Sequence, residues 1–343
     1  MNMKRVVSLD VLKYAACLMV VSIHMNLSPS LETVIQPFLT IAVPVFFMIT
    51  GYFYTPLYDS GKTTKQIKKI TALVVIANVL HLGFQFFKHV VNGEPIKELV
   101  AKWLDPSAIV QLIIFNQPVW RTSLWYINAL LYVLLVVYVV QKKWSNLNKL
   151  YPLIPILLVC NLLIGTYSIV LPTDSLVLCY SRNFLFCGLP YFLLGYYIYH
   201  NKSCMYNKAG KGIYFIVISA VAYAELLVLN AFKIPYHKDH LLSTAFLSCV
   251  LFCMFLNNEE KFNGRVCKVF AELGRKHSFV IYVVHSIIIE VFYRILEKTG
   301  TMMSILQSVF EWIGPLVVLM LSTLFAFAID VISRTVKNVF ITD

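Results

Sequence analysis

A lysine and a histidine near the N-terminus have the residue types and the spacing for acid–base chemistry on one helix face. Lys13 and His24 are eleven residues apart, which is about 20° from three full turns and about 16 Å along a helix axis. Asp10 lies one turn before Lys13, at the i,i+3 spacing that allows an ion pair. An imidazole can act as a base or a nucleophile near neutral pH. Asp10, Lys13 and His24 are therefore candidate catalytic residues.

Each of these side chains also has a structural interpretation. Lys13 can extend to the lipid headgroups, Asp10 can pair with it, and a histidine near a membrane interface is often only hydrogen-bonded. A charge at the centre of a membrane helix costs about 2.5–3.5 kcal/mol on insertion scales, which favours a functional reason for its presence. The spacing alone leaves both interpretations open.

Further polar residues interrupt other apolar segments. His285 and Glu290 share a segment near the C-terminus, where a packed structural histidine is the alternative to a site residue. Asn78 and His81 share an earlier segment at i,i+3, and for these two we expect hydrogen bonds between helices. Glu225 is a further carboxylate expected inside the membrane.

A lysine cluster lies at the start of the third apolar segment. Lys65, Lys68 and Lys69 are close together there, and the backbone N–H groups of a helix start also favour anions. The cluster is a candidate site for the phosphates of a cytosolic donor. Ordinary enrichment of lysine in cytoplasmic loops, or contact with anionic lipid, is the alternative explanation.

The elements that must position these residues are membrane helices. The 343 residues are 59% hydrophobic and 13% charged, with a mean hydropathy of +0.73, whereas soluble domains carry about 25% charged residues. We predict an all-α polytopic helix bundle that forms one integral membrane domain over residues 1–343. About ten segments have the length and apolar character of spans: 9–27, 36–54, 67–87, 124–141, 151–170, 184–200, 213–230, 241–256, 278–295 and 313–332. Segment 107–117 is too short to cross.

The distribution of basic residues orients this bundle. With the N-terminus in the cytoplasm, the inside loops hold about twice as many lysines and arginines as the outside loops. Both termini are then cytoplasmic, and His24 lies toward the outer surface. The net charge of +12 is explained by this bias, so we expect no nucleic-acid partner.

The eight cysteines form no CxxC pair, and most lie in apolar runs. A thiol in such a run usually behaves as a small hydrophobe. We therefore expect no metal site and no disulfide framework.

At these residues the chain resembles the acyltransferase-3 family, whose members commonly O-acylate glycans of bacterial envelopes. The family's first helix carries a basic residue, ten intervening residues and a histidine, as Lys13 and His24 do. Five further segments are similar to family motifs in the family's order: the aromatic stretch Pro44–Tyr52, the basic pair Lys65 and Lys68, the tryptophan motif Leu124–Tyr126, the box Phe192–Tyr196, and the box Gly274–His285. The resemblance covers almost the whole chain.

The resemblance implies an O-acyltransferase, with acetyl transfer as the expected reaction. It would move an acyl group from cytosolic acyl-CoA to a hydroxyl of an envelope glycan or glycolipid, in the bacterial cytoplasmic membrane. Acetyl-CoA or another acyl-CoA is the expected co-substrate, and no cofactor is expected to stay bound. The candidate substrate-binding residues are Arg182 for the oxyanion or the acceptor, Trp125 and Tyr126 for a sugar ring, and His285 and Glu290.

Two alternatives remain open at this point. The resemblance extends to the membrane halves of vancomycin-resistance serine racemases, which implies transport of a small molecule such as serine. A catalytically idle scaffold is the other. The chain departs from the family at one point. Polysaccharide-acylating members often carry a glutamate after the tryptophan motif, whereas this chain has Asn128-Ala129-Leu130 there.

Overall fold

The computed structural model describes residues 5–168, 177–202, 210–234, 240–298 and 303–340, and all regular secondary structure among them is helical. The predicted all-α class is confirmed. The N-terminal half contains α1 (Val7–Ile23), α2 (Pro29–Leu39), α3 (Ala42–Tyr52), α4 (Tyr54–Asp59), α5 (Thr63–Asn92), α6 (Ile96–Leu104), α7 (Pro106–Ile113), η1 (Thr122–Leu124), α8 (Trp125–Trp144), η2 (Asn148–Leu150) and α9 (Leu153–Ile164). The C-terminal half contains α10 (Val177–Ser181), the π-helical turn η4 (Phe184–Gly188), α11 (Leu189–His200), α13 (Gly212–Ala231), α14 (Leu242–Asn257), η5 (Glu259–Asn263), α15 (Arg265–Lys276), α16 (Ser278–Lys298) and α17 (Met303–Phe340).

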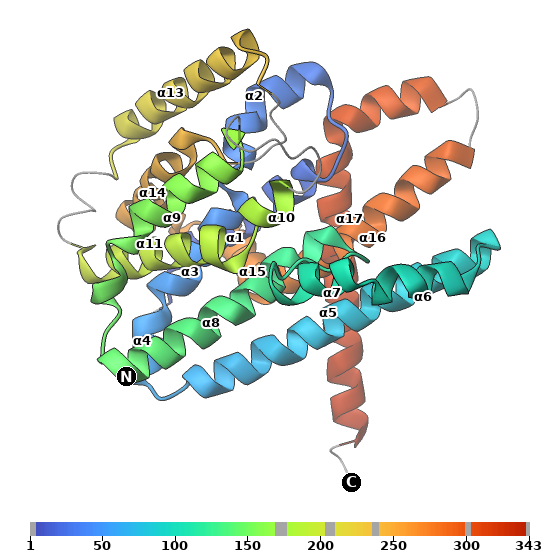
Figure 1. Cartoon of the computed structure of the whole chain (residues 1–343), viewed down its shortest axis with the longest axis horizontal. Coiled ribbons are helices and arrows are strands. Elements are labelled where there is room, and N and C mark those ends of the chain that lie inside the picture. The colour runs from blue at the N-terminus through green and yellow to red at the C-terminus, as the bar shows by residue number, and fades with distance from the viewer. Residues whose placement is uncertain (1–4, 169–176, 203–209, 235–239, 299–302, 341–343) are drawn as a thin grey trace. The chain divides into compact units, whose positions relative to one another are not determined.

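These helices form two compact units (Figure 1). The first unit consists mainly of Val43–Asn257 and runs from α3 to α14. The second unit combines Val6–Ala42 with Asn258–Asp343, so α1 and α2 pack with α15, α16 and α17. The first helix is thus joined to helices from the end of the sequence. The prediction of one integral membrane domain stays a prediction.

Six helical segments among the described residues are long and apolar enough to cross a membrane. They are Pro29–Asp59, Thr63–Asn92, Thr122–Trp144, Gly212–Ala231, Ser278–Glu297 and Ser308–Arg334. Each coincides with a predicted span, and the other four predicted spans coincide with the shorter helices α1, α9, α11 and α14. The number ten and the cytoplasmic placement of both termini therefore stay predictions.

Two predicted spans have different boundaries in the structure. The span expected at 36–54 comprises the end of α2 and all of α3, with Thr40 and Ile41 between them. Pro44, in the first turn of α3, has no N–H to donate to the Thr40 carbonyl. The helix in the span expected at 9–27 ends at Ile23. The next helix, α2, follows closely, with Ser28 as its N-cap and Pro29 at its first position. The short segment around 107–117 contains α7, only eight residues long.

Close backbone packing and amide hydrogen bonds hold the first unit together. A Cβ at Gly51 of α3 would overlap the Phe192 carbonyl oxygen of α11, and a Cβ at Gly195 would overlap the Met48 carbonyl oxygen. Small residues allow this approach of two membrane helices. Helices α5 and α8 lie side by side (Figure 1), and Asn78 donates to Asn128 across them over 3.1 Å. The predicted interhelical hydrogen bond of Asn78 is confirmed.

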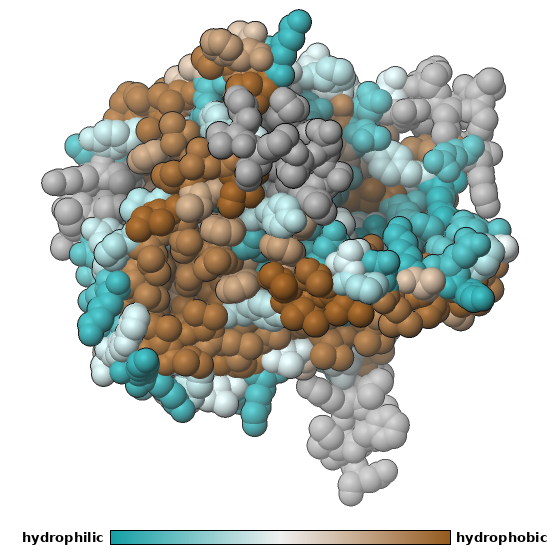
Figure 2. Space-filling view, in the orientation of Figure 1, coloured by the Kyte–Doolittle hydropathy of each residue, from teal (hydrophilic) through white to brown (hydrophobic). Residues whose placement is uncertain are grey.

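The outer surface of the first unit is strongly apolar. Figure 2 shows apolar side chains gathered over the face formed by α5 and α8, where Val79, Phe87 and Val139 are each more than 60% exposed. A soluble protein rarely exposes so continuous an apolar surface. Lipid contact accounts for it, in agreement with a membrane protein.

The second unit has its own apolar core. Val21 and Met25 from the end of α1 and Leu39 of α2 pack with Ile289 of α16 and Phe310 of α17. The Phe292 ring stacks on the Phe310 ring with centroids 3.7 Å apart. This core fixes the C-terminal end of α1 against α16.

Candidate functional site

The first helix carries the predicted ion pair. Lys13 Nζ lies 3.4 Å from Asp10 Oδ1, at the i,i+3 spacing that the sequence indicates. Asp10 is buried, whereas the Lys13 side chain is 25% exposed. A buried carboxylate needs such a partner, so Lys13 partly neutralises the charge of Asp10.

Helix α15 crosses α1 directly at this ion pair. A Cβ at Gly274 would overlap the Asp10 carbonyl oxygen, so only glycine permits this approach. Next to the crossing, the Tyr14 ring stacks on Phe270 with centroids 5.5 Å apart, and the Tyr14 hydroxyl lies 3.3 Å from the Thr323 hydroxyl of α17. Gly274, the first residue of the C-terminal family box, therefore determines how closely α15 holds α1.

The same box supplies a second histidine at the other end of α1. The His24 and His285 rings lie with centroids 5.2 Å apart and an interplanar angle of 35°. His285 is buried, and its Nδ1 lies 3.3 Å from the Ile281 carbonyl oxygen. Donation by Nδ1 to that carbonyl makes Nε2 the basic nitrogen of a neutral ring. Tyr282 borders the pair, with its ring centroid 6.0 Å from that of His285.

His24 occupies the cap position after α1 rather than a place within the helix. Its φ and ψ are −93° and 3°, its N–H donates to the Val21 carbonyl over 3.1 Å, and its side chain is exposed. Two residues later, the Asn26 N–H donates to the Tyr293 hydroxyl of α16 over 3.0 Å. The turn that presents His24 is thus attached to the helix that carries His285.

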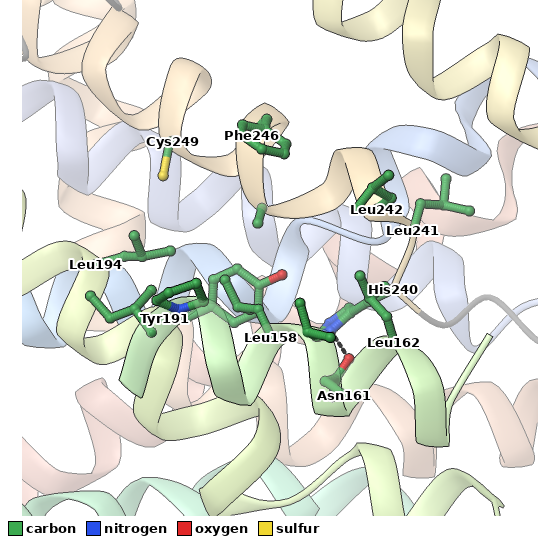
Figure 3. A pocket seen from close by; sticks show the side chains of 14 residues that line it. Leu158, Asn161, Leu162, Tyr191, Leu194, His240, Leu241, Leu242, Phe246 and Cys249 are labelled. Atoms are coloured by element: carbon green, nitrogen blue, oxygen red, sulfur yellow. Dashed lines mark hydrogen bonds between the residues drawn. The ribbon is translucent and has the colours of Figure 1, made fainter. Parts of the chain in front are cut away.

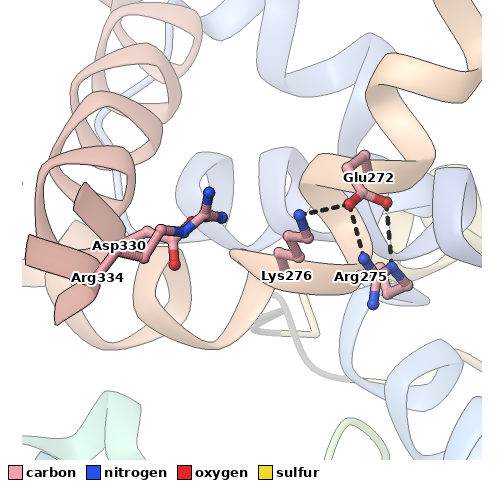
Figure 4. A network of polar contacts seen from close by, with 5 residues as sticks. All are labelled: Glu272, Arg275, Lys276, Asp330 and Arg334. Carbon is pink, nitrogen blue, oxygen red and sulfur yellow. Dashed lines mark hydrogen bonds and ion pairs between the residues drawn. The ribbon is translucent and has the colours of Figure 1, made fainter. Parts of the chain in front are cut away.

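A network of charges lies at the C-terminal end of α15. Figure 4 shows Glu272 between Arg275 and Lys276, each with a nitrogen 2.7 Å from Glu272 Oε1. Hydrogen bonds from Arg275 and Lys276 lower the pKa of Glu272 to about 2. On α17, Arg334 pairs with Asp330 at 2.6 Å. These ion pairs are exposed and therefore contribute little to the stability of the fold.

His277 joins α15 to α16 inside this region. It is buried, its N–H donates to the Leu273 carbonyl over 2.8 Å, and its ring lies 4.6 Å from that of Phe327. Burial lowers the pKa of His277, because a low-dielectric environment disfavours the charged imidazolium.

The remaining predicted site residues lie in several places. Lys65, Lys68 and Lys69 are exposed in the first two turns of α5, so their predicted position at a helix start is confirmed. Arg182 lies in the bend between α10 and η4, and Glu290 is half-buried in α16. The structure therefore places Asp10, Lys13, His24, His285 and Glu290 in the second unit, and the lysine cluster, Trp125, Tyr126 and Arg182 in the first.

The tryptophan motif is buried in the first unit. The Tyr126 ring meets Phe47 edge to face with centroids 4.9 Å apart, and Trp125 lies 6.4 Å from the same ring. Both residues are less than 10% exposed. Trp125 and Tyr126 therefore pack inside the first unit, and the stacking of a sugar on them stays a prediction.

Glu225 has a structural explanation. Its carboxylate accepts hydrogen bonds from the Tyr167 hydroxyl, from the Leu242 N–H, and from the Ser243 N–H and hydroxyl. Leu242 and Ser243 are the first residues of α14, so Glu225 satisfies N–H groups that the helix itself cannot pair.

The sequence did not reveal every residue that shapes the site. The contact between His24 and His285 was missed, although both were named. Tyr14 and Phe270 were missed because aromatic residues are frequent in membrane segments. The position of Tyr14 directly after Lys13 is the only signal that could have indicated it.

The fold and the site together define a helical membrane protein in which a histidine after the first helix meets a histidine of a late helix. Residues 6–331 match the family described as an acyltransferase domain, acyltransferase-3. The match spans nearly the whole chain, so the protein belongs to this family, and the resemblance seen in the sequence motifs is confirmed. Searches of curated proteins and of solved structures found no match. Membership indicates a membrane acyltransferase in general terms and lends no support to the transport alternative.

Proposed function

We propose that the protein is an O-acyltransferase that moves an acyl group, with acetyl as the expected one, from cytosolic acyl-CoA to a hydroxyl of an envelope glycan or glycolipid. Its proposed location is the bacterial cytoplasmic membrane. The observation that carries the proposal is the His24–His285 pair, formed at the end of a helix that also holds the Asp10–Lys13 pair. Family membership supports acyl transfer as the reaction class.

In this proposal His24 is the general base. Its imidazole takes the proton of the acceptor hydroxyl while the hydroxyl oxygen attacks the thioester carbonyl carbon. The carbon–sulfur bond then breaks, coenzyme A leaves as its thiolate, and the imidazolium returns the proton to that sulfur. The alternative order places the acyl group on His24 first and then on the acceptor. Both orders give the same products.

His285 acts as a positioning residue in this scheme. It is buried and held by the Ile281 carbonyl, so its ring is a fixed surface against which the exposed His24 ring rests. A base held in place before the substrate arrives loses less entropy in the transition state. Glu290 of the same helix is proposed to contact the acceptor. Arg182 is proposed to contact the acceptor or the oxyanion, and Trp125 and Tyr126 to contact a sugar.

The donor's phosphates are assigned to the lysine cluster of α5. Three exposed lysines lie in the first two turns of α5, and both positive charge and a helix N-terminus attract phosphate. Lys13 is a further cation, on α1, although its charge is partly neutralised by the ion pair with Asp10. Cytosolic placement of this cluster rests on the predicted orientation.

Two measurements test the function. Mass spectrometry of envelope glycans and glycolipids should find an O-acylated product in cells that carry the gene and not in cells that lack it. Purified protein should bind coenzyme A, and Lys65→Gln combined with Lys68→Gln should weaken binding about ten-fold or more. The matched control changes Lys97 and Lys102, two exposed lysines of α6, to Gln. Unchanged O-acylation together with no binding of coenzyme A would contradict acyl transfer.

A further inference from the structure

The first unit contains a cavity whose lining includes none of the residues assigned to acyl transfer. It has a volume of about 280 Å³ and lies between α9, α11 and the start of α14. Figure 3 shows its wall, with Leu158, Leu194, Phe246 and Cys249 among the apolar side chains. None of the described residues that line it carries a carboxylate, ammonium or guanidinium group. Such a lining binds a hydrocarbon and rejects an ion.

One end of this cavity is polar. His240 Nδ1 lies 3.0 Å from Asn161 Oδ1, and Asn161 Nδ2 donates to the Ser181 carbonyl over 2.7 Å. Both side chains are more than 90% buried, and the Tyr191 ring meets His240 edge to face with centroids 5.3 Å apart (Figure 3). His240 orients the Asn161 amide, and Asn161 Nδ2 carries a second hydrogen besides the one donated to Ser181, which it can donate to a neutral carbonyl oxygen of a bound molecule.

Cys187 supports this polar end from outside the cavity. Its sulfur lies 3.9 Å from His240 Nε2, which resembles the start of a cysteine–histidine–asparagine arrangement. Cys187 is fully buried and is not part of the cavity wall. The thiol therefore cannot reach a bound molecule, and the arrangement holds the imidazole rather than providing a nucleophile.

The cavity opens among side chains that face lipid. Leu242, Phe246 and Val159 line it and are 57%, 59% and 51% exposed. They belong to the short apolar segments Asn148–Ile164 and Leu242–Asn257. The nearby carboxylate of Glu225 is occupied by the N–H groups of α14. In a membrane, the molecule at this opening is a lipid.

The volume suits one chain rather than a whole lipid. It is nearly twice the roughly 150 Å³ of an apolar cavity that takes up a benzene ring. A hydrocarbon segment fills such a space, and an apolar cavity of this size left empty forfeits the contacts of its lining atoms.

We propose that this cavity binds one acyl chain of a membrane glycerolipid, with the ester carbonyl of that chain at the Asn161–His240 end. The chain enters between Leu242 and Phe246 and runs past Leu158 toward Leu194 and Cys249. This lipid site does not depend on the acyl-transfer reaction, and it belongs entirely to the first unit.

Photo-crosslinking of the full-length protein in detergent tests the site. The probe is a phosphatidylcholine with a diazirine near the end of one acyl chain, added at about one molecule per protein. Peptide mapping should place the cross-links on Leu194, Cys249 or their neighbours. Ala245→Trp fills the cavity and should reduce these cross-links about ten-fold. Ala220→Trp, on the exposed face of α13, is the matched control and should leave them unchanged.

Cys249 gives a second readout in the unmodified chain. It lines the cavity, so added phosphatidylcholine should slow its alkylation by an apolar maleimide, while Cys267 of α15 should react at an unchanged rate. This measurement decides the question if Ala245→Trp does not fold. Cross-links spread evenly over the apolar faces of α5 and α13, or equal effects of lipid on Cys249 and Cys267, would overturn the proposal.

Discussion

The imidazole rings of His24 and His285 lie with their centroids 5.2 Å apart, and this contact joins the end of α1 to the middle of α16. His285 is buried and bonded to the Ile281 carbonyl, whereas His24 is exposed. One imidazole is thus buried in the unit and the other is exposed. In the proposed reaction, His24 is the base and His285 positions it.

Replacing His285 should lower catalysis without weakening donor binding. We expect His285→Ala to reduce kcat about ten- to hundredfold, since a misplaced base loses orientation, with KM for acyl-CoA unchanged. Because the two rings act together, the His24→Ala, His285→Ala double variant should be little slower than His24→Ala alone. Rates of O-acyl transfer from acyl-CoA measure both effects.

The matched control for this pair is His200→Ala in the first unit. His200 is exposed and pairs with Thr55 over 2.9 Å, so its loss should leave kcat within about twofold. Independent, additive losses for the two variants His24→Ala and His285→Ala would contradict a shared role.

Adding a methyl group at Gly274 should separate α15 from α1. The new Cβ would overlap the Asp10 carbonyl oxygen, and such overpacking costs about 1–3 kcal/mol. We expect Gly274→Ala to lower the unfolding temperature in detergent and also the transfer rate, because α1 carries Lys13 and presents His24. Gly212→Ala is the control, since a Cβ there meets no atom within 4 Å. An unfolding temperature that Gly274→Ala leaves unchanged would contradict the close crossing.

The free energy of unfolding should decrease as the pH falls below neutrality, because of His277. Burial lowers its pKa in the folded chain, while the unfolded chain takes up the proton at about pH 6.5. The unfolded state then binds more protons below that pH, so this contribution is present at neutral pH and is lost as the pH falls below about 6.5. Unfolding temperatures between about pH 5 and 8 should therefore depend less steeply on pH in His277→Asn than in the wild type.

Glu272, whose exposed ion pairs contribute little to stability, titrates at a lower pH than His277. The Glu272 pKa is lowered to about 2, so its contribution is lost only as the pH falls from about 4.3 toward that value. Glu272→Gln should leave the pH dependence near neutrality as it is in the wild type. A pH slope in His277→Asn equal to that of the wild type would contradict the burial of a neutral His277.

The sequence predicted the helices well because hydrophobicity and length decide them. All ten predicted spans coincide with helices, and the span at 67–87, interrupted by Asn78 and His81, belongs to the long helix Thr63–Asn92. Hydropathy could not reveal the interruption at Thr40 and Ile41, between α2 and α3. Nor could it reveal the end of α1, which the next helix start at Ser28 and Pro29 determines.

Contacts between segments far apart in the chain could not be predicted from the sequence. The spacing of Lys13 and His24 indicated one helix face, but periodicity along one helix cannot say which other helix meets it. The grouping of α1 with α15 and α16 depends on the absent side chain of Gly274 and on the core around Met25 and Phe310. The family boxes named Gly274 and His285 without showing that both contact the first helix.

In the proposed reaction, His24 is the group that carries out acyl transfer. The most direct test measures the O-acyl content of envelope glycans and glycolipids, by mass spectrometry, in cells expressing the wild type, His24→Ala or no protein. We expect His24→Ala, inserted in the membrane at the wild-type level, to lose about a hundredfold or more of the activity, as removal of a general base typically does. O-acylation by His24→Ala close to the wild-type level would contradict the central claim.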